Sequence, residues 1–162
     1  MDDLSVEPWL CVDTDLRFGN PNLADFVDYW RARARGRPCP SRNDIDLAEL
    51  RRYMGDMFLI DVVGPPDEFV YRLIGTRIVE AGGGDAAGKT VAKVFGRENA
   101  EAVLRTYRYV AEQVGPLRYH GVLSWQDRDY RHYESVLLPL AEAGAAVNML
   151  IGVMYTWTKG SG

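Results

Sequence analysis

The chain has 162 residues, of which 47% are hydrophobic and 26% are charged, and this size and composition are typical of one globular domain with its own core. The formal net charge of −4 argues against nucleic acid as the main partner, because phosphate binding needs a positive field. We expect no membrane association, because no stretch approaches the ~20 apolar residues of a membrane span and the N-terminus does not resemble a signal peptide.

The first third of the chain predicts an arm followed by helices. Residues 1–20 have a mixed composition and are predicted to form an irregular N-terminal arm. A helix follows and ends near Gly36. Its apolar stripe, spaced by three and four residues, consists of Leu23, Phe26, Val27 and Trp30. A second short helix is predicted from Asp46, so that residues 21–55 form an N-terminal helical extension.

Residues 56–158 are predicted to form a sheet interrupted by helices. The predicted elements are strands at 57–63 and 69–74, short helical turns within 75–96, a long helix at 97–114, and strands at 117–126, 130–140 and 147–157. The first two strands are apolar at both odd and even positions, which indicates cover on both faces of the sheet. The N-terminal helix is available to cover the outer face.

This order of elements, with several short motifs, resembles the PAS domain family, and in particular a bacterial family of stand-alone PAS-like proteins of unknown function. The motifs are Pro40-Ser41-Arg42 before Asp44-Ile45-Asp46, then Met57 to Asp61, Tyr71 to Thr76, Ala87 to Thr90, and Leu137 to Leu140. The resemblance implies an α+β fold, with a five-stranded antiparallel sheet and helices on one face that form one wall of a cavity. It also implies a cytoplasmic sensor of a small organic ligand or a signalling partner, with no catalytic residues or cofactor to carry over.

A competing motif lies in the glycine-rich segment. Gly83 to Thr90 satisfies the pattern G-x-x-x-x-G-K-[ST] of a phosphate-binding loop. Such a loop needs a buried parallel strand before it and a full helix after it. Here Gly96 interrupts the next segment after about one and a half helical turns, and hairpins follow instead of strand–helix units. We interpret the segment as a connecting turn, with a nucleotide-using enzyme as the less favoured alternative.

Metal chemistry has few candidate ligands. The only histidines, His120 and His132, lie on strands of one predicted hairpin. The two registers considered place His132 opposite Leu123 or Ser124, and neither brings the imidazoles within reach of one ion. Neither cysteine belongs to a metal-type pair. We therefore expect neither zinc nor haem. We also expect both cysteines to be reduced thiols, as is usual in a cytoplasmic protein.

Aromatic residues provide the remaining signal, because several share the inner face of the strand at 117–126. Gly121 at its centre could leave room for a cavity. A two-residue turn would place His132 and Glu134 inside, whereas a longer loop would place Tyr133 and Ser135 there. We favour the first register because it also turns Val136 and Leu138 inward. The predicted ligand-binding residues are Tyr71, Tyr107, Tyr119, Leu123, Trp125, His132, Glu134 and Tyr155.

Two functions remain as alternatives. A cavity of ~300 Å³ or more between the long helix and the sheet would favour ligand binding. A filled core would favour an interaction-only domain, dimerising through the N-terminal helix and the outer sheet face. A homodimer is the expected assembly.

Overall fold

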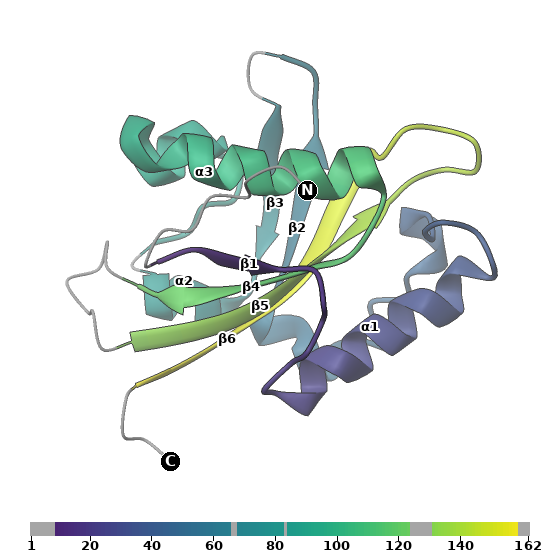
Figure 1. Cartoon of the computed structure of the whole chain (residues 1–162), viewed down its shortest axis with the longest axis horizontal. Coiled ribbons are helices and arrows are strands. Elements are labelled where there is room, and N and C mark those ends of the chain that lie inside the picture. The colour runs from purple at the N-terminus through teal and green to yellow at the C-terminus, as the bar shows by residue number, and fades with distance from the viewer. Residues whose placement is uncertain (1–8, 66–67, 83, 124–130, 159–162) are drawn as a thin grey trace.

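The computed structural model describes residues 9–65, 68–82, 84–123 and 131–158. The strands are β1 (Cys11–Asp13), β2 (Met57–Val62), β3 (Phe69–Ile74), β4 (Leu117–Val122), β5 (Arg131–Leu140) and β6 (Met149–Thr158). The helices are α1 (Pro21–Ala34), α2 (Thr76–Gly82) and α3 (Val91–Gln113), with 3-10 turns at Arg42–Asp44 and Arg51–Asp56. The strands form one antiparallel sheet in the order β1-β4-β5-β6-β2-β3. In Figure 1 α3 crosses in front of β2 and β3.

The sheet has six strands rather than the expected five, because part of the predicted irregular arm is β1. This strand pairs with β4, Cys11 opposite His120 and Asp13 opposite Arg118. The arm can approach because Gly121 has no side chain: a Cβ there would lie 2.5 Å from the carbonyl carbon of Trp9. The room that Gly121 leaves is therefore taken by the arm and not by the cavity.

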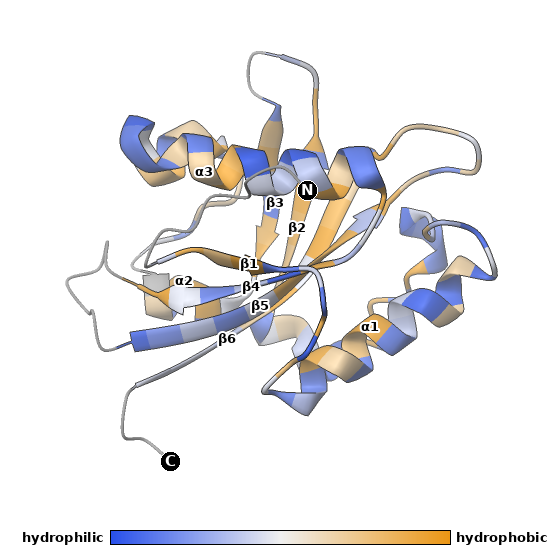
Figure 2. Ribbon diagram, in the orientation of Figure 1, coloured by the Kyte–Doolittle hydropathy of each residue, from blue (hydrophilic) through white to orange (hydrophobic). Residues whose placement is uncertain are grey.

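The apolar stripe of α1 is buried within its own chain, as predicted for a helix that covers the outer sheet face. Asn20 caps the helix by accepting a hydrogen bond from the backbone N–H of Asn22. The side chains of Leu23, Phe26, Val27 and Trp30 are at most 4% exposed, and Figure 2 shows hydrophobic and hydrophilic residues interleaved along α1. The indole N–H of Trp30 donates to the carbonyl oxygen of Pro139 at 2.9 Å. This hydrogen bond ties α1 to β5.

The short helix predicted from Asp46 begins later than expected: residues 47–50 form a turn, and a 3-10 helix follows at Arg51–Asp56. The carboxylate of Asp46 accepts from the N–H of Ala48, a local bond that competes with helix formation. The capping box lies earlier, where Asp44 and Ser41 bond each other's backbone. The hydrogen bond from the Ser41 N–H, followed by that from Arg37, lowers the pKa of Asp44.

The helices between β3 and β4 match the sequence expectation. Short helical turns were predicted within 75–96, and α2 and the first turn of α3 lie there. Gly96 has φ 75° and ψ 166°, so it breaks the helical path before the long predicted helix begins. That helix ends at Gln113, with Val114 as its C-cap immediately before Gly115-Pro116.

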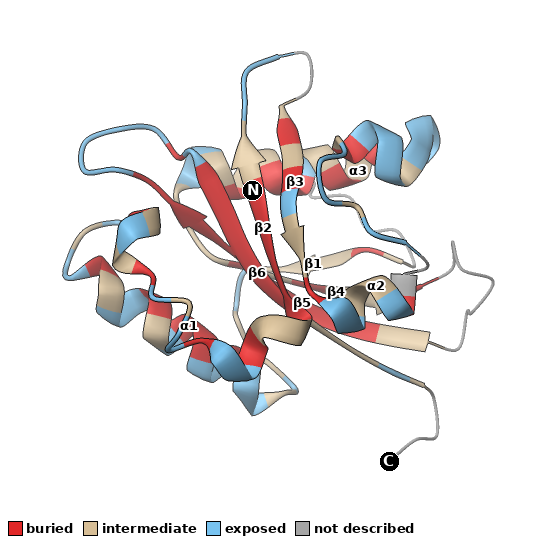
Figure 3. Ribbon diagram, turned by 180° about the vertical axis from the view of Figure 1, so that it is seen from behind, coloured by how far each residue is buried: buried red, intermediate tan, exposed pale blue. Residues whose placement is uncertain are grey.

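The favoured hairpin register is wrong. Tyr119 pairs with Ser135 and Val122 with His132, which is neither register considered and turns Tyr133 and Ser135 toward α3. His132, Glu134 and Val136 consequently face the outer side. Val136 was expected on the inner face because it is apolar. The outer face is also buried, however, and Val136 and Leu138 are fully buried there beneath α1. Figure 3 shows the buried residues along this part of the sheet from behind.

Candidate functional site

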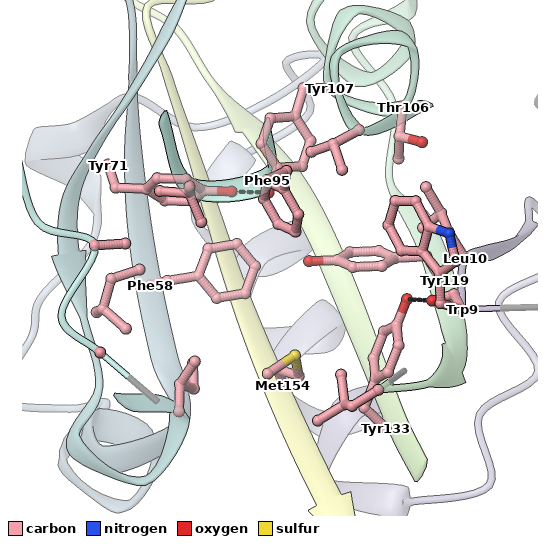
Figure 4. Close-up of a pocket in the computed structure, with 17 residues that line it drawn as sticks. Trp9, Leu10, Phe58, Tyr71, Phe95, Thr106, Tyr107, Tyr119, Tyr133 and Met154 are labelled. Atoms are coloured by element: carbon pink, nitrogen blue, oxygen red, sulfur yellow. Dashed lines mark hydrogen bonds between the residues drawn. The ribbon is translucent and has the colours of Figure 1, made fainter. Parts of the chain in front are cut away.

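A cavity of about 180 Å³, partly open to solvent, lies between α3 and the inner face of the sheet (Figure 4). Its walls come from the arm, β2, β3, α2, α3, β4, β5 and β6. The lining residues are Trp9, Leu10, Phe58, Tyr71, Ile74, Ile78, Gly84, Ala86, Val94, Phe95, Val103, Thr106, Tyr107, Tyr119, Leu123, Tyr133 and Met154. The volume is below the ~300 Å³ expected for a drug-sized ligand. The space is nevertheless not filled by the described side chains.

Seven of the 17 residues that line the cavity are aromatic. Phe58 lies over Gly152 of the neighbouring strand, where a Cβ would come within 2.2 Å of its ring. Glycine at position 152 therefore lets the ring pack flat against the sheet. The ring of Tyr107 meets that of Tyr71 edge to face, at a centroid distance of 6.4 Å, and Trp9 stacks on Phe95 at 6.3 Å.

Four tyrosine hydroxyls supply the polar groups at this site. The hydroxyls of Tyr71 and Tyr107 bond each other at 2.7 Å, and that of Tyr133 donates to the carbonyl oxygen of Trp9 at 2.6 Å. Figure 4 shows the Tyr119 hydroxyl pointing into the cavity. Burial raises the pKa of each of these phenols well above its ordinary value. They are therefore neutral hydrogen-bonding groups at physiological pH.

No Asp, Glu, Lys, Arg or His stands among the lining residues in the described parts of the chain. Thr106, another polar residue of the lining, donates its hydroxyl proton to the carbonyl oxygen of Ala102 in its own helix. An ion in such a site would lose its hydration without gaining a counter-charge, at a cost of several kcal/mol. The cavity is therefore suited to a neutral molecule.

The structure separates the sequence-predicted site residues into two groups. Tyr71, Tyr107, Tyr119 and Leu123 line the cavity, and Trp125 lies outside the described residues. The expectation that His132, Glu134 and Tyr155 face it is wrong, because the register turns these three to the outer side. Sequence reasoning missed Trp9, Phe58, Phe95 and Met154, and it assigned Tyr133 only in the register that was not favoured.

Glu134 is a structural anchor on the outer side of the sheet. Its side chain is 4% exposed and accepts from the N–H groups of Gly19 and Asn20, at 2.8 and 2.9 Å. Arg118 donates to the same carboxylate at 2.7 Å and also bonds Asp13 of β1 at 3.2 Å. One carboxylate thus joins β5, β4, the arm and the start of α1.

Both histidines lie on the outer side, near Cys11. Burial, and then the charge of Arg118, lower the pKa of His120. His132 stacks on Trp157, with ring centroids 5.8 Å apart. Within the described ranges, no group of three or more His, Cys, Asp or Glu side chains is arranged to hold a metal ion.

The glycine-rich segment at 83–90 includes residues that hydrogen-bond to the free edge of β3. The N–H of Gly88 donates to the carbonyl oxygen of Tyr71, whose own N–H donates to the carbonyl oxygen of Lys89. Asp85 accepts from the N–H of Ala87, and Thr90 caps α3 by accepting from Lys93. A phosphate-binding loop would direct such N–H groups at its ligand, whereas here they are engaged within the chain.

ATP with Mg²⁺ should therefore not bind at millimolar concentration. Isothermal titration of the full chain should give only the heat of dilution, and Lys89→Ala should match the unsubstituted protein. Lys93→Ala, one turn into α3, is the matched control. Micromolar affinity that Lys89→Ala abolishes and Lys93→Ala retains would contradict this expectation and revive the enzyme alternative.

Comparisons with known proteins agree with this architecture. A family model described as PAS domain matches residues 19–155, whereas no curated protein matches. Among solved structures, the PAS domain of Bordetella pertussis BvgS is 17% identical with a TM-score of 0.52, over 71% of this chain and 88% of that one. A Colwellia psychrerythraea PAS domain is 17% identical (TM-score 0.46, 70% and 99% covered). A Rhodobacter sphaeroides LOV protein is 14% identical (TM-score 0.47, 72% and 71% covered).

The described helices were also tested for membrane spans. None combines the length and the apolar character that crossing a bilayer requires.

Proposed function

This chain belongs to the PAS domain family, and on that premise we propose that it is a cytoplasmic sensory or regulatory module that binds a small organic ligand beneath α3. PAS domains are typically sensory modules without enzymatic activity. The observation that carries the proposal is the cavity of about 180 Å³ lined by aromatic rings and tyrosine hydroxyls.

The energetic cost of the cavity supports a ligand. Apolar lining residues such as Phe58, Phe95 and Val103 lose dispersion contacts wherever no atom fills the space beside them. Binding of a ligand to the folded state alone would offset the cost by mass action.

Native mass spectrometry of the purified full chain tests the proposal, together with thermal unfolding in the presence of a panel of small organic molecules. We expect an added mass that is lost on denaturation, or a panel member that raises the melting temperature. Val103→Phe should abolish both effects, because Val103 lines the cavity and the larger ring would occupy it.

Leu104→Phe is the matched control, because Leu104 is the next residue of α3 and does not line the cavity. An unmodified mass together with no thermal shift from any panel member would contradict the proposal and favour the interaction-only domain.

Homodimerisation is the second candidate function, and the observation that favours it is Trp157. This indole is 44% exposed beside His132 on the outer side, and exposed aromatic side chains are enriched at protein interfaces. The apolar stripe of α1 is buried inside the chain and is not available for a dimer. The native mass spectra report the subunit count directly, and a monomer at micromolar concentration would exclude this candidate.

A further inference from the structure

The ligand class follows from the size, charge and hydrogen-bonding capacity of the cavity. We infer that the cavity binds a neutral, single-ring aromatic molecule carrying one hydroxyl group, of which phenol is the simplest example. This inference rests on the proposed function, because it names the ligand of the same site.

Volume sets the size of the ligand. An engineered apolar cavity of about 150 Å³ binds benzene, and the cavity here measures about 180 Å³. One aromatic ring with a small substituent fits this space, whereas fused-ring cofactors exceed it. The surrounding rings of Phe58, Phe95 and Tyr107 offer edge and face contacts to a flat ligand, each worth about 0.5–1.5 kcal/mol beyond burial.

The tyrosine pair provides a hydrogen bond that the protein itself does not use. Tyr71 and Tyr107 have two hydroxyl protons but share one hydrogen bond, and neither hydroxyl has a second partner in the described chain. One proton is therefore left to donate, and the phenolic oxygens keep lone pairs that can accept. A ligand hydroxyl can do both, because it accepts from one phenol while it donates to another.

Tyr119 completes this polar end of the cavity. Its hydroxyl points into the cavity (Figure 4). It is hydrogen-bonded to the side chain of Ser135 and lies close enough to Tyr71 and Tyr107 for the three phenols to interact electrostatically. The hydroxyls of Tyr71, Tyr107 and Tyr119 thus lie near one another, and Val103, Leu123 and Met154 are among the apolar residues of the lining. This arrangement selects a molecule with one polar end.

Titration calorimetry of the full chain with phenol, toluene and benzoate tests the inference. Phenol should bind about tenfold more tightly than toluene, because it alone gains the hydrogen bond. Benzoate should bind more weakly than either, because its charge would be buried without a partner. Equal affinity for toluene and phenol, or a preference for benzoate, would overturn the inference while leaving a ligand-binding cavity.

The double variant Tyr71→Phe/Tyr107→Phe isolates the hydroxyl pair. It removes both partners of one buried hydrogen bond without changing the shape of either ring, and such paired replacements are nearly neutral for stability. The preference for phenol over toluene should fall to about twofold or less, with toluene affinity retained. Tyr109→Phe, on α3 outside the cavity, should keep the preference.

Two other outcomes overturn the inference. In the first, the double variant keeps the tenfold preference. In the second, none of the three probes binds at millimolar concentration. The native mass spectra then decide the proposed function separately, because a bound molecule of another class would support ligand sensing and an empty cavity would not.

Discussion

Raising the pH above about 10 should unfold the protein in one steep transition. The four cavity tyrosines, Tyr71, Tyr107, Tyr119 and Tyr133, are at most 8% exposed, and burial raises the pKa of all four above the ordinary value of 10.0. Above pH 10 the unfolded chain releases these protons while the folded chain retains them. The stability they contribute is therefore complete below pH 10 and is lost as pH rises.

The size of this effect follows from proton linkage. Each retained proton lowers the free energy of unfolding by about 1.4 kcal/mol per pH unit, so four phenols together give about 5 kcal/mol per unit. Urea denaturation at a series of pH values between 8 and 11 measures the slope. The near-ultraviolet absorbance of tyrosinate should rise together with the loss of circular dichroism.

A variant tests which residues are responsible. Tyr71→Phe/Tyr107→Phe removes two of the four phenols, so its slope should fall to about half. If the buried tyrosines ionised near pH 10 while the fold persisted, the cavity would be accessible to water and the expectation would be wrong.

Glu134→Gln should destabilise the protein by about 3 kcal/mol. The carboxylate accepts three hydrogen bonds, two from backbone N–H groups and one from Arg118, and its side chain is 4% exposed. An amide has one acceptor oxygen and brings an NH₂ group against these donors, while Arg118 keeps its charge in a largely buried position. Breaking one side of a buried ion pair typically costs about 3–5 kcal/mol.

Urea denaturation at pH 7 measures this loss, and Glu142→Gln is the matched control because Glu142 is exposed in the turn before β6. Ligand affinity of the folded variant should not change, because Glu134 faces away from the cavity. A stable Glu134→Gln protein with weakened ligand binding would instead indicate that Glu134 is a ligand-binding residue, as the sequence analysis expected.

The elements could be predicted from local patterns. The stripe of Leu23, Phe26, Val27 and Trp30 predicted the buried face of α1, because a helix repeats every 3.6 residues and a buried stripe must follow that repeat. The order of strands and helices, with the PAS-like motifs, predicted the architecture. Tyr71, Tyr107 and Tyr119 were placed at the cavity because each belongs to an element whose inner face was evident.

The hairpin faces and the arm were decided by tertiary structure. Burial normally reports which side of a strand faces the core, but β5 is covered by α3 on one side and by α1 on the other, so Glu134 and Ser135 are both buried. When both faces of a strand are buried, the pattern of apolar residues does not tell which side chains point to which face. The three-residue β1 has no periodicity to detect, and it pairs with β4 because Gly121 lets the backbone of Trp9 approach. Trp9 can line the cavity only because of this contact with Gly121, which lies 112 positions away in the sequence.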